Sequence, residues 1–266
     1  AMKFTDPRDS DLVLCFRDDG AGHCEAAASI GADEMIALPQ RSDFHTADAL
    51  IYLFSIDGRS YFLIDGDADR PSERSFLPIR ELIARKDDYH AFAIATGMHL
   101  WRWYRDNRFC GCCGAPLEPS THERALVCPA CEHVTYPRIS PAVIVAVTNG
   151  DHLLLTRYAQ GGYRKLALVA GFVEVGETPE QAVAREVKEE CGLQVKNVRY
   201  YASQPWGLSG SLMLGFVAEL DGDPTITLQD CELAWAGWIA RNEIDAPEGY
   251  ALGHAMIEAF KNGALI

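Results

Sequence analysis

The feature that most restricts the fold of this chain is a pair of cysteine motifs near its middle. Cys110 and Cys113 form one C-x2-C motif, Cys128 and Cys131 form a second, and 14 residues separate the two. Each motif holds two thiolates on a tight turn, so the two together offer a Zn²⁺ ion four tetrahedral ligands. A closed four-thiolate set leaves no position for a reacting water. The spacing therefore predicts a small ribbon built around a structural zinc ion.

The cysteines of the chain as a whole do not favour a disulfide framework. Their total is nine, an odd number, and five of the nine fall between Cys110 and Cys131, a concentration that indicates metal binding. Cys112 is a spare thiol, because adjacent cysteines cannot both occupy the tetrahedron. The residues between the two motifs include acids and form no basic patch, which favours a structural ribbon over one that binds nucleic acid.

Charge and hydropathy narrow the class of protein. A net charge of −14 opposes the binding of long nucleic acids, because Lys and Arg neutralise phosphates. No uncharged apolar run approaches the roughly 18 residues that span a bilayer, and the first residues lack the apolar segment of a signal peptide. We therefore expect a cytoplasmic protein without membrane contact.

A second restricted segment is a helix expected over residues 179–190. Thr178 is a favourable N-cap, Pro179 suits the first helical turn, and Thr178 with Gln181 forms a capping box. Gly192 supplies a stop at the C-terminal end. Both ends of this helix are therefore predicted from local residues.

This helix carries three carboxylates on one face, because Glu186, Glu189 and Glu190 stand at i, i+3 and i+4. Like charges at this spacing repel unless a cation compensates them, and Mg²⁺ or Mn²⁺ would do so while also gripping phosphate oxygens. Arg185 is expected to pair with Glu177 of the preceding loop and to hold loop and helix together. The arrangement predicts a divalent metal site.

The segment from Gly171 to Leu193 meets the full spacing G-x5-E-x7-R-E-U-x-E-E-x-G-U, in which U is aliphatic. This string resembles the Nudix box. The resemblance implies an α/β/α sandwich that hydrolyses a nucleoside diphosphate linked to another group. It further implies that Glu186 and Glu190 ligate the catalytic Mg²⁺ or Mn²⁺, with Glu189 assisting.

Downstream, Ser203-Gln204-Pro205-Trp206 and Ser211 resemble the S-Q-P-W-P-F-P-x-S signature of NADH pyrophosphatases, a Nudix subfamily that also has zinc motifs before its Nudix domain. The resemblance covers about residues 105 to 240. One departure is that positions 207–209 read Gly-Leu-Ser. Without the two prolines we expect a looser loop, whose ordering on binding costs about 1 kcal/mol or more per residue, and a weaker case for NADH specificity.

The same resemblance implies a substrate site and a further metal ligand. Phe172 and Trp206 are expected to stack a nicotinamide ring and Tyr136 an adenine, and Glu232 matches a distal acid that adds a ligand to the metal. The residues implied to line the substrate site are Arg80, Glu123, Tyr136, Ala170, Phe172, Gln204, Pro205, Trp206, Gly207, Leu208, Ser209, Gly210 and Ser211.

The expected fold class is α+β in three parts: an N-terminal mixed α/β domain over 1–105, the zinc ribbon over 106–137, and a Nudix sandwich over 138–266. In the first part, Asp57-Gly58 predicts a hairpin between strands 50–56 and 60–64. A helix over about 89–104 is expected to present Phe92, Ala95, His99 and Trp103 on one face. Further on, 142–147 predicts a buried strand, followed by a turn at 149–151 and a return strand.

The expected activity is hydrolysis of NADH or NAD⁺ to AMP and nicotinamide mononucleotide, with Glu189 as the base, and removal of NAD caps from RNA 5′ ends. An alternative is the same chemistry on another nucleoside diphosphate such as ADP-ribose. An alternative of a different class is a non-catalytic adaptor whose zinc ribbon binds nucleic acid. Resemblance to the subfamily also implies a homodimer joined through the N-terminal part.

Overall fold

The computed structural model describes residues 6–18, 23–44, 50–64, 75–85, 88–159, 165–228, 232–245 and 249–265. The chain forms two compact units. The N-terminal unit comprises Ala1–Arg138 and Gly207–Ser209, and the C-terminal unit comprises Ile139–Trp206 and Gly210–Ile266. Because the zinc ribbon falls within the N-terminal unit, the division into three domains stays a prediction. No described helix has the length and apolar character needed to cross a membrane.

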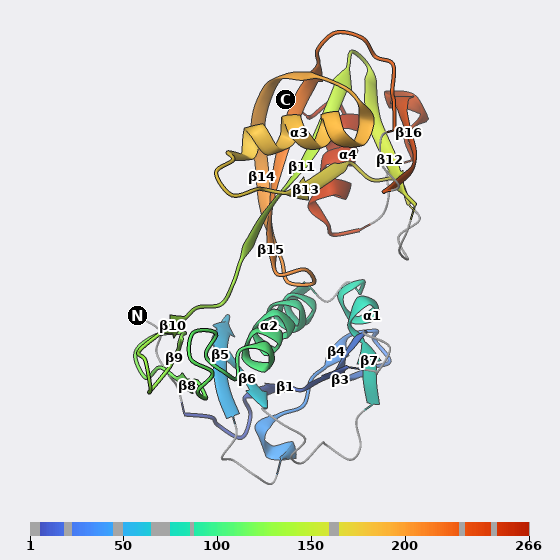
Figure 1. Ribbon diagram of the computed structural model, residues 1–266. Helices are drawn as coiled ribbons and strands as arrows, with labels where there is room; N and C mark the ends of the chain where they lie inside the picture. Colours follow the sequence, from blue (N-terminus) through green and yellow to red (C-terminus); the bar gives the residue numbers. More distant parts are fainter. Residues whose placement is uncertain are drawn as a thin grey trace. The chain divides into compact units, whose positions relative to one another are not determined.

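The N-terminal unit is a mixed α/β structure, as predicted (Figure 1). Asp57 and Gly58 have positive φ angles of 48° and 79°, as a two-residue hairpin turn requires, which confirms the predicted hairpin between β5 and β6. One sheet has the order β1–β6–β5, with β1 parallel to β6, and consists of β1 (Leu12–Leu14), β6 (Arg59–Ile64) and β5 (Leu50–Ile56). The other described strands outside the ribbon are β2 (Phe16–Asp18), β3 (Cys24–Ile30), β4 (Ile36–Ala37) and β7 (Ser75–Pro78), with the short helices η1 (Arg41–Asp43) and α1 (Ile79–Ile83).

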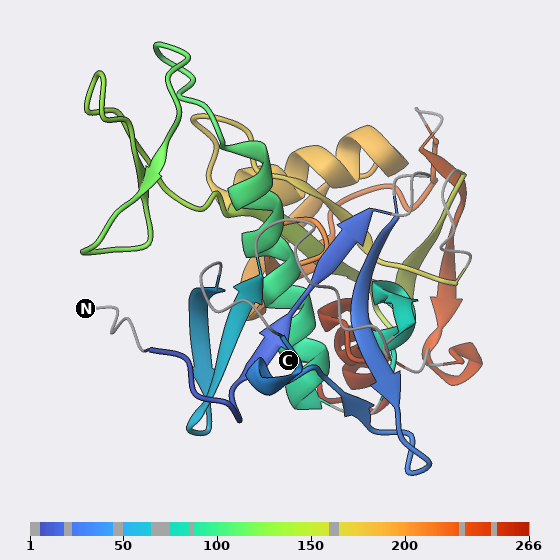
Figure 2. The same cartoon turned by 90° about the horizontal axis from the view of Figure 1, so that it is seen from below.

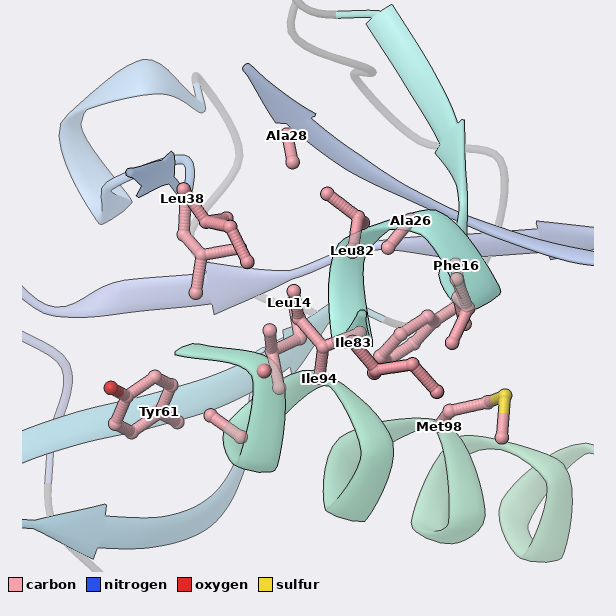
Figure 3. Packing of buried hydrophobic residues seen from close by; sticks show 14 of the residues in the cluster. Leu14, Phe16, Ala26, Ala28, Leu38, Tyr61, Leu82, Ile83, Ile94 and Met98 are labelled. Carbon is pink, nitrogen blue, oxygen red and sulfur yellow. The ribbon is translucent and has the colours of Figure 1, made fainter. Parts of the chain in front are cut away.

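Helix α2 (Asp88–Asp106) confirms the helix predicted over 89–104 and packs beside β5 and β6 (Figure 2). The face that carries Phe92 is not uniformly buried, because Phe92 is 50% exposed and Trp103 is buried, whereas Ile94 and Met98 are both buried. The reason is a close approach at Gly97, where an added Cβ would lie 2.3 Å from Leu14 Cδ1. This glycine lets the strand side chains reach the helix on the face of Ile94 and Met98 (Figure 3).

The zinc ribbon has little regular structure (Figure 2). Its three short strands pair in the order β10–β9–β8 and are all antiparallel. They are β8 (Glu118–Pro119), β9 (Leu126–Val127) and β10 (Val134–Thr135). A segment this small buries little apolar surface, so a metal is expected to supply much of its stability.

The C-terminal unit is built on one mixed sheet with the order β14–β15–β11–β12–β16, and β13 pairs with β11. The parallel pair is β11 with β15, and the other pairs are antiparallel. The strand predicted over 142–147 and its return strand are confirmed as β11 and β12. The strands are β11 (Ser140–Asn149), β12 (His152–Tyr158), β13 (Val169–Phe172), β14 (Val195–Trp206), β15 (Ser211–Leu220) and β16 (Leu233–Ala240), followed by η2 (Arg241–Glu243).

Two helices cover opposite faces of this sheet, which confirms the predicted α/β/α sandwich (Figure 1). Alternate residues of β11 point to opposite faces. Val143 and Val145 pack with α3 (Pro179–Cys191), whereas Ile144 and Ala146 pack with α4 (Leu252–Lys261). We call these the α3 face and the α4 face of the sheet.

Helix α3 begins and ends where its local residues predict. Thr178 Oγ1 accepts a hydrogen bond from Gln181 N at 3.3 Å, and Gln181 Oε1 accepts one from Thr178 N at 2.8 Å. Gly192, with a φ of 74°, closes the C-terminal end, and its N–H donates to Lys188 O. The capping box satisfies two backbone donors that the first turn leaves without partners.

Removal of the Thr178 hydroxyl tests how far this cap stabilises the C-terminal unit. Thr178→Ala is expected to lower the free energy of unfolding by about 1 kcal/mol, because one N–H of the first turn loses its acceptor. Thr178→Ser keeps the hydroxyl and serves as the control. Urea unfolding followed by circular dichroism measures both variants, and equal midpoints for them would contradict this account of the cap.

Candidate functional site

The four cysteines of the ribbon converge as a zinc site requires. Their Sγ atoms all lie within 4.8 Å of one another, with 3.6 Å between Cys110 and Cys131 and 3.5 Å between Cys113 and Cys128. Tetrahedral zinc with Zn–S bonds of about 2.3 Å places sulfurs about 3.8 Å apart. Cys112 is exposed and stands outside the cluster, as predicted. The site fits a structural zinc ion.

Backbone N–H donors favour the ionised form of one of these thiols, the form that binds a metal. The N–H groups of Cys113 and Cys112 donate to Cys110 Sγ and lower the pKa of this thiol to about 6. The pKa of Cys131 shifts to about 12, because its contacts with neighbouring thiols outweigh a hydrogen bond from the His133 N–H that lowers it. Four crowded sulfurs cannot all ionise without a cation, and zinc binding supplies that cation.

Serine substitution separates the zinc ligands from the spare thiol. Cys128→Ser is expected to abolish zinc binding and to lower the melting temperature of the ribbon, because three thiolates leave the tetrahedron incomplete. Cys112→Ser, a change two residues from a ligand, is the matched control and should keep its zinc. Atomic absorption on purified protein measures the zinc content. Loss of zinc from the Cys112 variant would contradict the assigned ligand set.

The three glutamates of α3 differ in their exposure to solvent. Glu190 is buried, the Glu186 side chain is 13% exposed, and the Glu189 side chain is 55% exposed. Glu232 immediately precedes β16. Its negative charge raises the pKa of both Glu186 and Glu190. The predicted face therefore contains two enclosed carboxylates and one that solvent reaches.

Arg185 ties the loop to the helix as predicted. Its Nε and Nη2 donate to the two carboxylate oxygens of Glu177, each at 2.9 Å, and Nη2 also donates to Phe172 O at 2.9 Å. Its Nη1 donates to Glu186 Oε1 at 2.8 Å and to Glu189 Oε2 at 3.2 Å. One guanidinium thus orients the loop, strand β13 and two of the glutamates.

Gly171 brings strand β13 against this carboxylate cluster. A Cβ at this position would lie 2.0 Å from Glu186 Oε1, so no larger residue fits without displacing the carboxylate. Gly176, with a φ of 87°, lets the loop turn between strand and helix. Both glycines lie in the segment from β13 to the acidic face of α3.

Arg185 pairs with Glu186, but no cationic side chain among the residues that the structure describes pairs with Glu190. Burial, together with the charges of Glu186, Glu232 and Glu189, raises the pKa of Glu190 from the usual 4.5 to about 8. Burial also raises the pKa of Glu186, although Arg185 opposes this shift. Glu190 Oε2 is buried and has no hydrogen-bond partner among the residues that the structure describes. Oxygen ligands with unbalanced charge fit a hard cation such as Mg²⁺ or Mn²⁺.

The raised pKa of Glu190 predicts how stability depends on pH without divalent ions. The folded state keeps a proton at Glu190 that the unfolded state has released, so the free energy of unfolding falls as pH rises from about 4.5 to about 8. Glu190→Gln stays neutral, and its melting temperature should exceed that of the wild type by a margin that grows across this range. Thermal unfolding in buffers free of Mg²⁺ and Mn²⁺ measures this margin, and a margin independent of pH would contradict the assignment.

The residues predicted to bind substrate are divided between the two units. In the ribbon, Tyr136 is 56% exposed and its hydroxyl donates to Glu123 Oε1 at 2.9 Å. Arg80 is an exposed residue of α1. Those in the C-terminal unit are Ala170, Phe172, Gln204, Pro205, Trp206, Gly210 and Ser211.

The turn at 207–209 is not loose, which corrects the expectation drawn from its missing prolines. Leu208 packs against the hydrophobic core of the N-terminal unit, and its carbonyl accepts a hydrogen bond from Arg102 Nη1 at 2.8 Å. At Gly207 an added Cβ would lie 2.2 Å from Ala95 O, so glycine permits this contact. Packing orders the turn where prolines would have restricted the chain.

Tyr250 is an aromatic residue of this region that the sequence does not predict to contact Trp206. Tyr250 stacks on Trp206, with ring centroids 5.7 Å apart and an angle of 28° between the planes. It lies just before α4, outside any motif or periodic pattern, and 44 residues of chain separate it from Trp206. No local signal in the sequence indicates the contact.

Comparisons with known proteins agree with this geometry. The NUDIX domain family matches residues 138–260, and the NADH pyrophosphatase zinc ribbon domain matches residues 105–136. The chain is 40% identical to the NAD-capped RNA hydrolase NudC of Pasteurella multocida, over 70% of each chain. It is 44% identical to the protein of the same name from Citrobacter koseri, over 62% of this chain and 64% of that one.

A solved structure is similar in fold to part of this chain. The crystal structure of a NUDIX hydrolase from Nitrosomonas europaea is similar with a TM-score of 0.51 and 24% identity. The likeness covers 58% of this chain and 91% of that chain.

Proposed function

Because the chain belongs to the Nudix hydrolase family, in the form that carries an NADH pyrophosphatase zinc ribbon, we propose that it hydrolyses the pyrophosphate bond of NADH and NAD⁺. The products are AMP and nicotinamide mononucleotide. The same bond occurs at the 5′ end of NAD-capped RNA, and removal of that cap is part of the proposal, as the names of the relatives suggest. The homodimer and the cytoplasmic location predicted from the sequence also belong to it.

The observation that carries the proposal is the uncompensated acidic cluster. Glu190 presents a buried oxygen that no described residue contacts by a hydrogen bond, and the charges of Glu186 and Glu232 act on this carboxylate. These residues, with Glu189, would hold Mg²⁺ or Mn²⁺, which supplies Lewis-acid activation of phosphoryl oxygens when bound. A protein that placed this much negative charge together without such a ligand would lose stability.

Within this site Glu189 is the residue best suited to act as the base. It is the most exposed of the three glutamates of α3, and its hydrogen bond from Arg185 is the longest that this arginine makes within the cluster. Water attacks one phosphorus, its proton passes to the Glu189 carboxylate, and the bond to the bridging oxygen breaks. The phosphate of the other half leaves with the electron pair of that bond.

The remaining residues position the reacting groups. Arg185 holds Glu177 and Glu186, and Gly171 permits strand β13 to lie against the cluster. We assign Phe172 and Trp206 to the flat rings of the substrate, on the basis of the resemblance to the subfamily. Arg80, Glu123 and Tyr136 of the N-terminal unit stay predicted substrate-binding residues, on the basis of the same resemblance.

Two alternatives predict different results. Hydrolysis of ADP-ribose uses the same acidic cluster and differs only in the ring that is recognised. A non-catalytic adaptor that binds nucleic acid through its ribbon would need no acidic cluster, and a net charge of −14 opposes such binding. The presence of the whole acidic set favours an enzyme.

Mass analysis of products decides among these functions. The protein is incubated with NADH, NAD⁺, ADP-ribose and NAD-capped RNA in the presence of Mg²⁺ or Mn²⁺. We expect AMP and nicotinamide mononucleotide from NADH, with Glu189→Gln lowering kcat about 10²- to 10⁴-fold, the usual contribution of a general base.

Glu180→Gln is the matched control, because Glu180 is an exposed carboxylate in the first turn of the same helix. It should keep the wild-type rate. Near-normal turnover by Glu189→Gln would rule out its role as base. A wild-type protein that left every dinucleotide intact would overturn the proposed function itself.

A further inference from the structure

The C-terminal unit contains a polar pocket that is separate from the acidic cluster. Its volume is about 500 Å³, within the range of pockets that hold small molecules. The pocket lies where β11 and β15 end, where β14 begins and beside the last turn of α4. Its lining contains three cations, Lys196, Arg199 and Arg241, and one carboxylate, Glu219. In a chain with a net charge of −14, this local excess of positive charge indicates a site for an anion.

The register of the sheet separates this pocket from the acidic cluster. Gly171, whose position adjoins Glu186, pairs with Val143 of β11, and Val143 lies on the α3 face. Thr148, which lines the pocket, stands further along β11 and lies on the α4 face. Between Val143 and Thr148, rises of about 3.3 Å per residue add up to roughly 16 Å. A ligand in the pocket is therefore not at the bond that is cut.

A β-bulge in β14 turns two of the cations to the same face. Lys196 pairs with Glu219 and Arg199 pairs with Val217, so β14 has one residue more than β15 over this stretch. Neighbouring residues of a strand alternate between faces, and without the extra residue the two cations would point to opposite faces. Val217 lies on the α4 face, because it pairs with Ala146. Lys196 and Arg199 therefore both project on the α4 face.

Asn197 gives this bulge its shape. Its φ is 53°, in the left-handed region that few residues other than glycine adopt and that Asn enters more readily than most. Its Nδ2 donates a hydrogen bond to Glu219 Oε2 at 3.0 Å. Bulges often redirect side chains next to functional sites. This bulge brings two cations to the pocket and engages the carboxylate of its lining with an amide.

Arg199 is the cation of the pocket whose donors are free. Its side chain is exposed, and within the part of the chain that the structure describes it makes no hydrogen bond, ion pair or ring contact. A guanidinium presents five N–H donors in a planar fork that matches the oxygens of a phosphate. The donors of Arg199 are thus available to a ligand.

Arg241, in contrast, is already held in one position. Its guanidinium lies over the ring of Phe260, 4.2 Å from the centroid, and its Nη1 donates to Phe260 O. Its Nε donates to Asp151. Among the described residues its Nη2 has no acceptor. A guanidinium fixed in this way loses little conformational entropy when it binds a ligand.

Two of the cations pair with aspartates outside the lining, but these pairs leave donors for a ligand. Lys196 Nζ lies 3.1 Å from Asp221 Oδ1, and the side chains of Asp221 and Asp151 are 50% and 67% exposed. Ion pairs with such exposed carboxylates are weak. An ammonium also has three donors, and Asp221 engages one of them. Lys196 and Arg241 can therefore both bind a further anion.

The charges of the lining favour a phosphate group over other anions. A phosphate monoester has a charge of about −1.5 to −2 near neutral pH and three oxygens that accept hydrogen bonds. Two guanidinium groups and an ammonium match this charge better than they match the single charge of a carboxylate. The apolar side chains of Leu220, Phe260 and Leu265 also line the pocket, and they can contact the sugar or base of a nucleotide.

We propose that this pocket is a second ligand site, which binds a phosphate group, either free or as the 5′-phosphate of a mononucleotide, through Arg199, Arg241 and Lys196. The inference goes beyond the proposed hydrolysis, because it concerns binding without turnover on the opposite face of the sheet. Both nucleotide products of that reaction have a 5′-phosphate, so either product has the chemistry that this site recognises.

Calorimetry tests whether the pocket binds this ligand. The full-length protein is titrated with AMP, inorganic phosphate and adenosine in a buffer without added Mg²⁺ or Mn²⁺, because the carboxylates of the acidic cluster then repel a phosphate. We expect AMP to bind and adenosine not to bind. Arg199→Gln should raise the Kd for AMP about tenfold or more, the effect of losing a hydrogen bond to a charged group.

Arg157→Gln is the matched control. Arg157 is another exposed arginine of the C-terminal unit, it lies outside the pocket lining, and its loss changes the net charge by the same amount. This variant should keep the Kd for AMP within about twofold of the wild type, less than the effect of one lost hydrogen bond. An equal rise in Kd in both variants would overturn the site. Failure of AMP to bind the wild type, or equal affinity for adenosine and AMP, would overturn it as well.

Inorganic phosphate shows which part of the ligand the pocket recognises. Tighter binding of AMP than of phosphate supports contacts between the apolar lining and the nucleoside, and equal Kd values support recognition of the phosphate group alone. In either case Arg199→Gln must weaken the binding. Because these measurements need no hydrolysis, their failure is distinct from failure of the proposed function.

Substitution of Asn197 tests the role of the bulge in positioning the cations. Asn197→Val is expected to raise the Kd for AMP about tenfold, because a β-branched residue strains the left-handed conformation and a straightened strand turns one of the two cations away. Asn197→Gly adopts the same φ without strain and should bind AMP as the wild type does. If Asn197→Val is folded by circular dichroism and keeps the wild-type Kd, the role of the bulge is overturned.

Discussion

The structure of the C-terminal unit depends on how it accommodates the negative charges of the α3 glutamates next to its sheet. Glu186 lies against Gly171 of β13, Glu190 is buried on the same helix, and the charge of Glu232 raises the pKa of both carboxylates. Burial of a carboxylate is unfavourable unless hydrogen bonds or a cation compensate it. Arg185 compensates Glu186 in part, yet Glu190 Oε2 has no hydrogen-bond partner in the part of the chain that the structure describes. Binding of a divalent ion to these carboxylates would therefore lower the free energy of the folded protein.

Several features of the unit follow from keeping these oxygens in place. The capping box of Thr178 starts α3 at a defined residue, and the bidentate contact of Arg185 with Glu177 joins the loop to the second turn of that helix. Gly171 removes the side chain that would otherwise occupy the carboxylate position. Each feature acts close to α3, and together they fix where the carboxylates of this helix lie.

Locality also explains which parts could be predicted from the sequence. The zinc ligands, the ends of α3 and its acidic face depend on residues within a few turns of one another, so spacing alone revealed them. The buried face of α2 did not follow from spacing, because the approach of Leu14 to Gly97 selected it from a distant strand. The stacking of Tyr250 on Trp206 joins two residues that are far apart in the sequence, and no local pattern encodes such a contact.

The turn at 207–209 shows how a long-range contact can replace a local one. Proline restricts a turn through its own ring, before the chain folds. Here Leu208 enters a hydrophobic core and Arg102 binds its carbonyl, so packing supplies the restriction after folding. Gly207 is then needed for a reason unrelated to flexibility, since Ala95 O occupies the space of any side chain. A departure from a family motif therefore need not loosen the site, because the order that the motif encodes locally can be supplied by tertiary contacts.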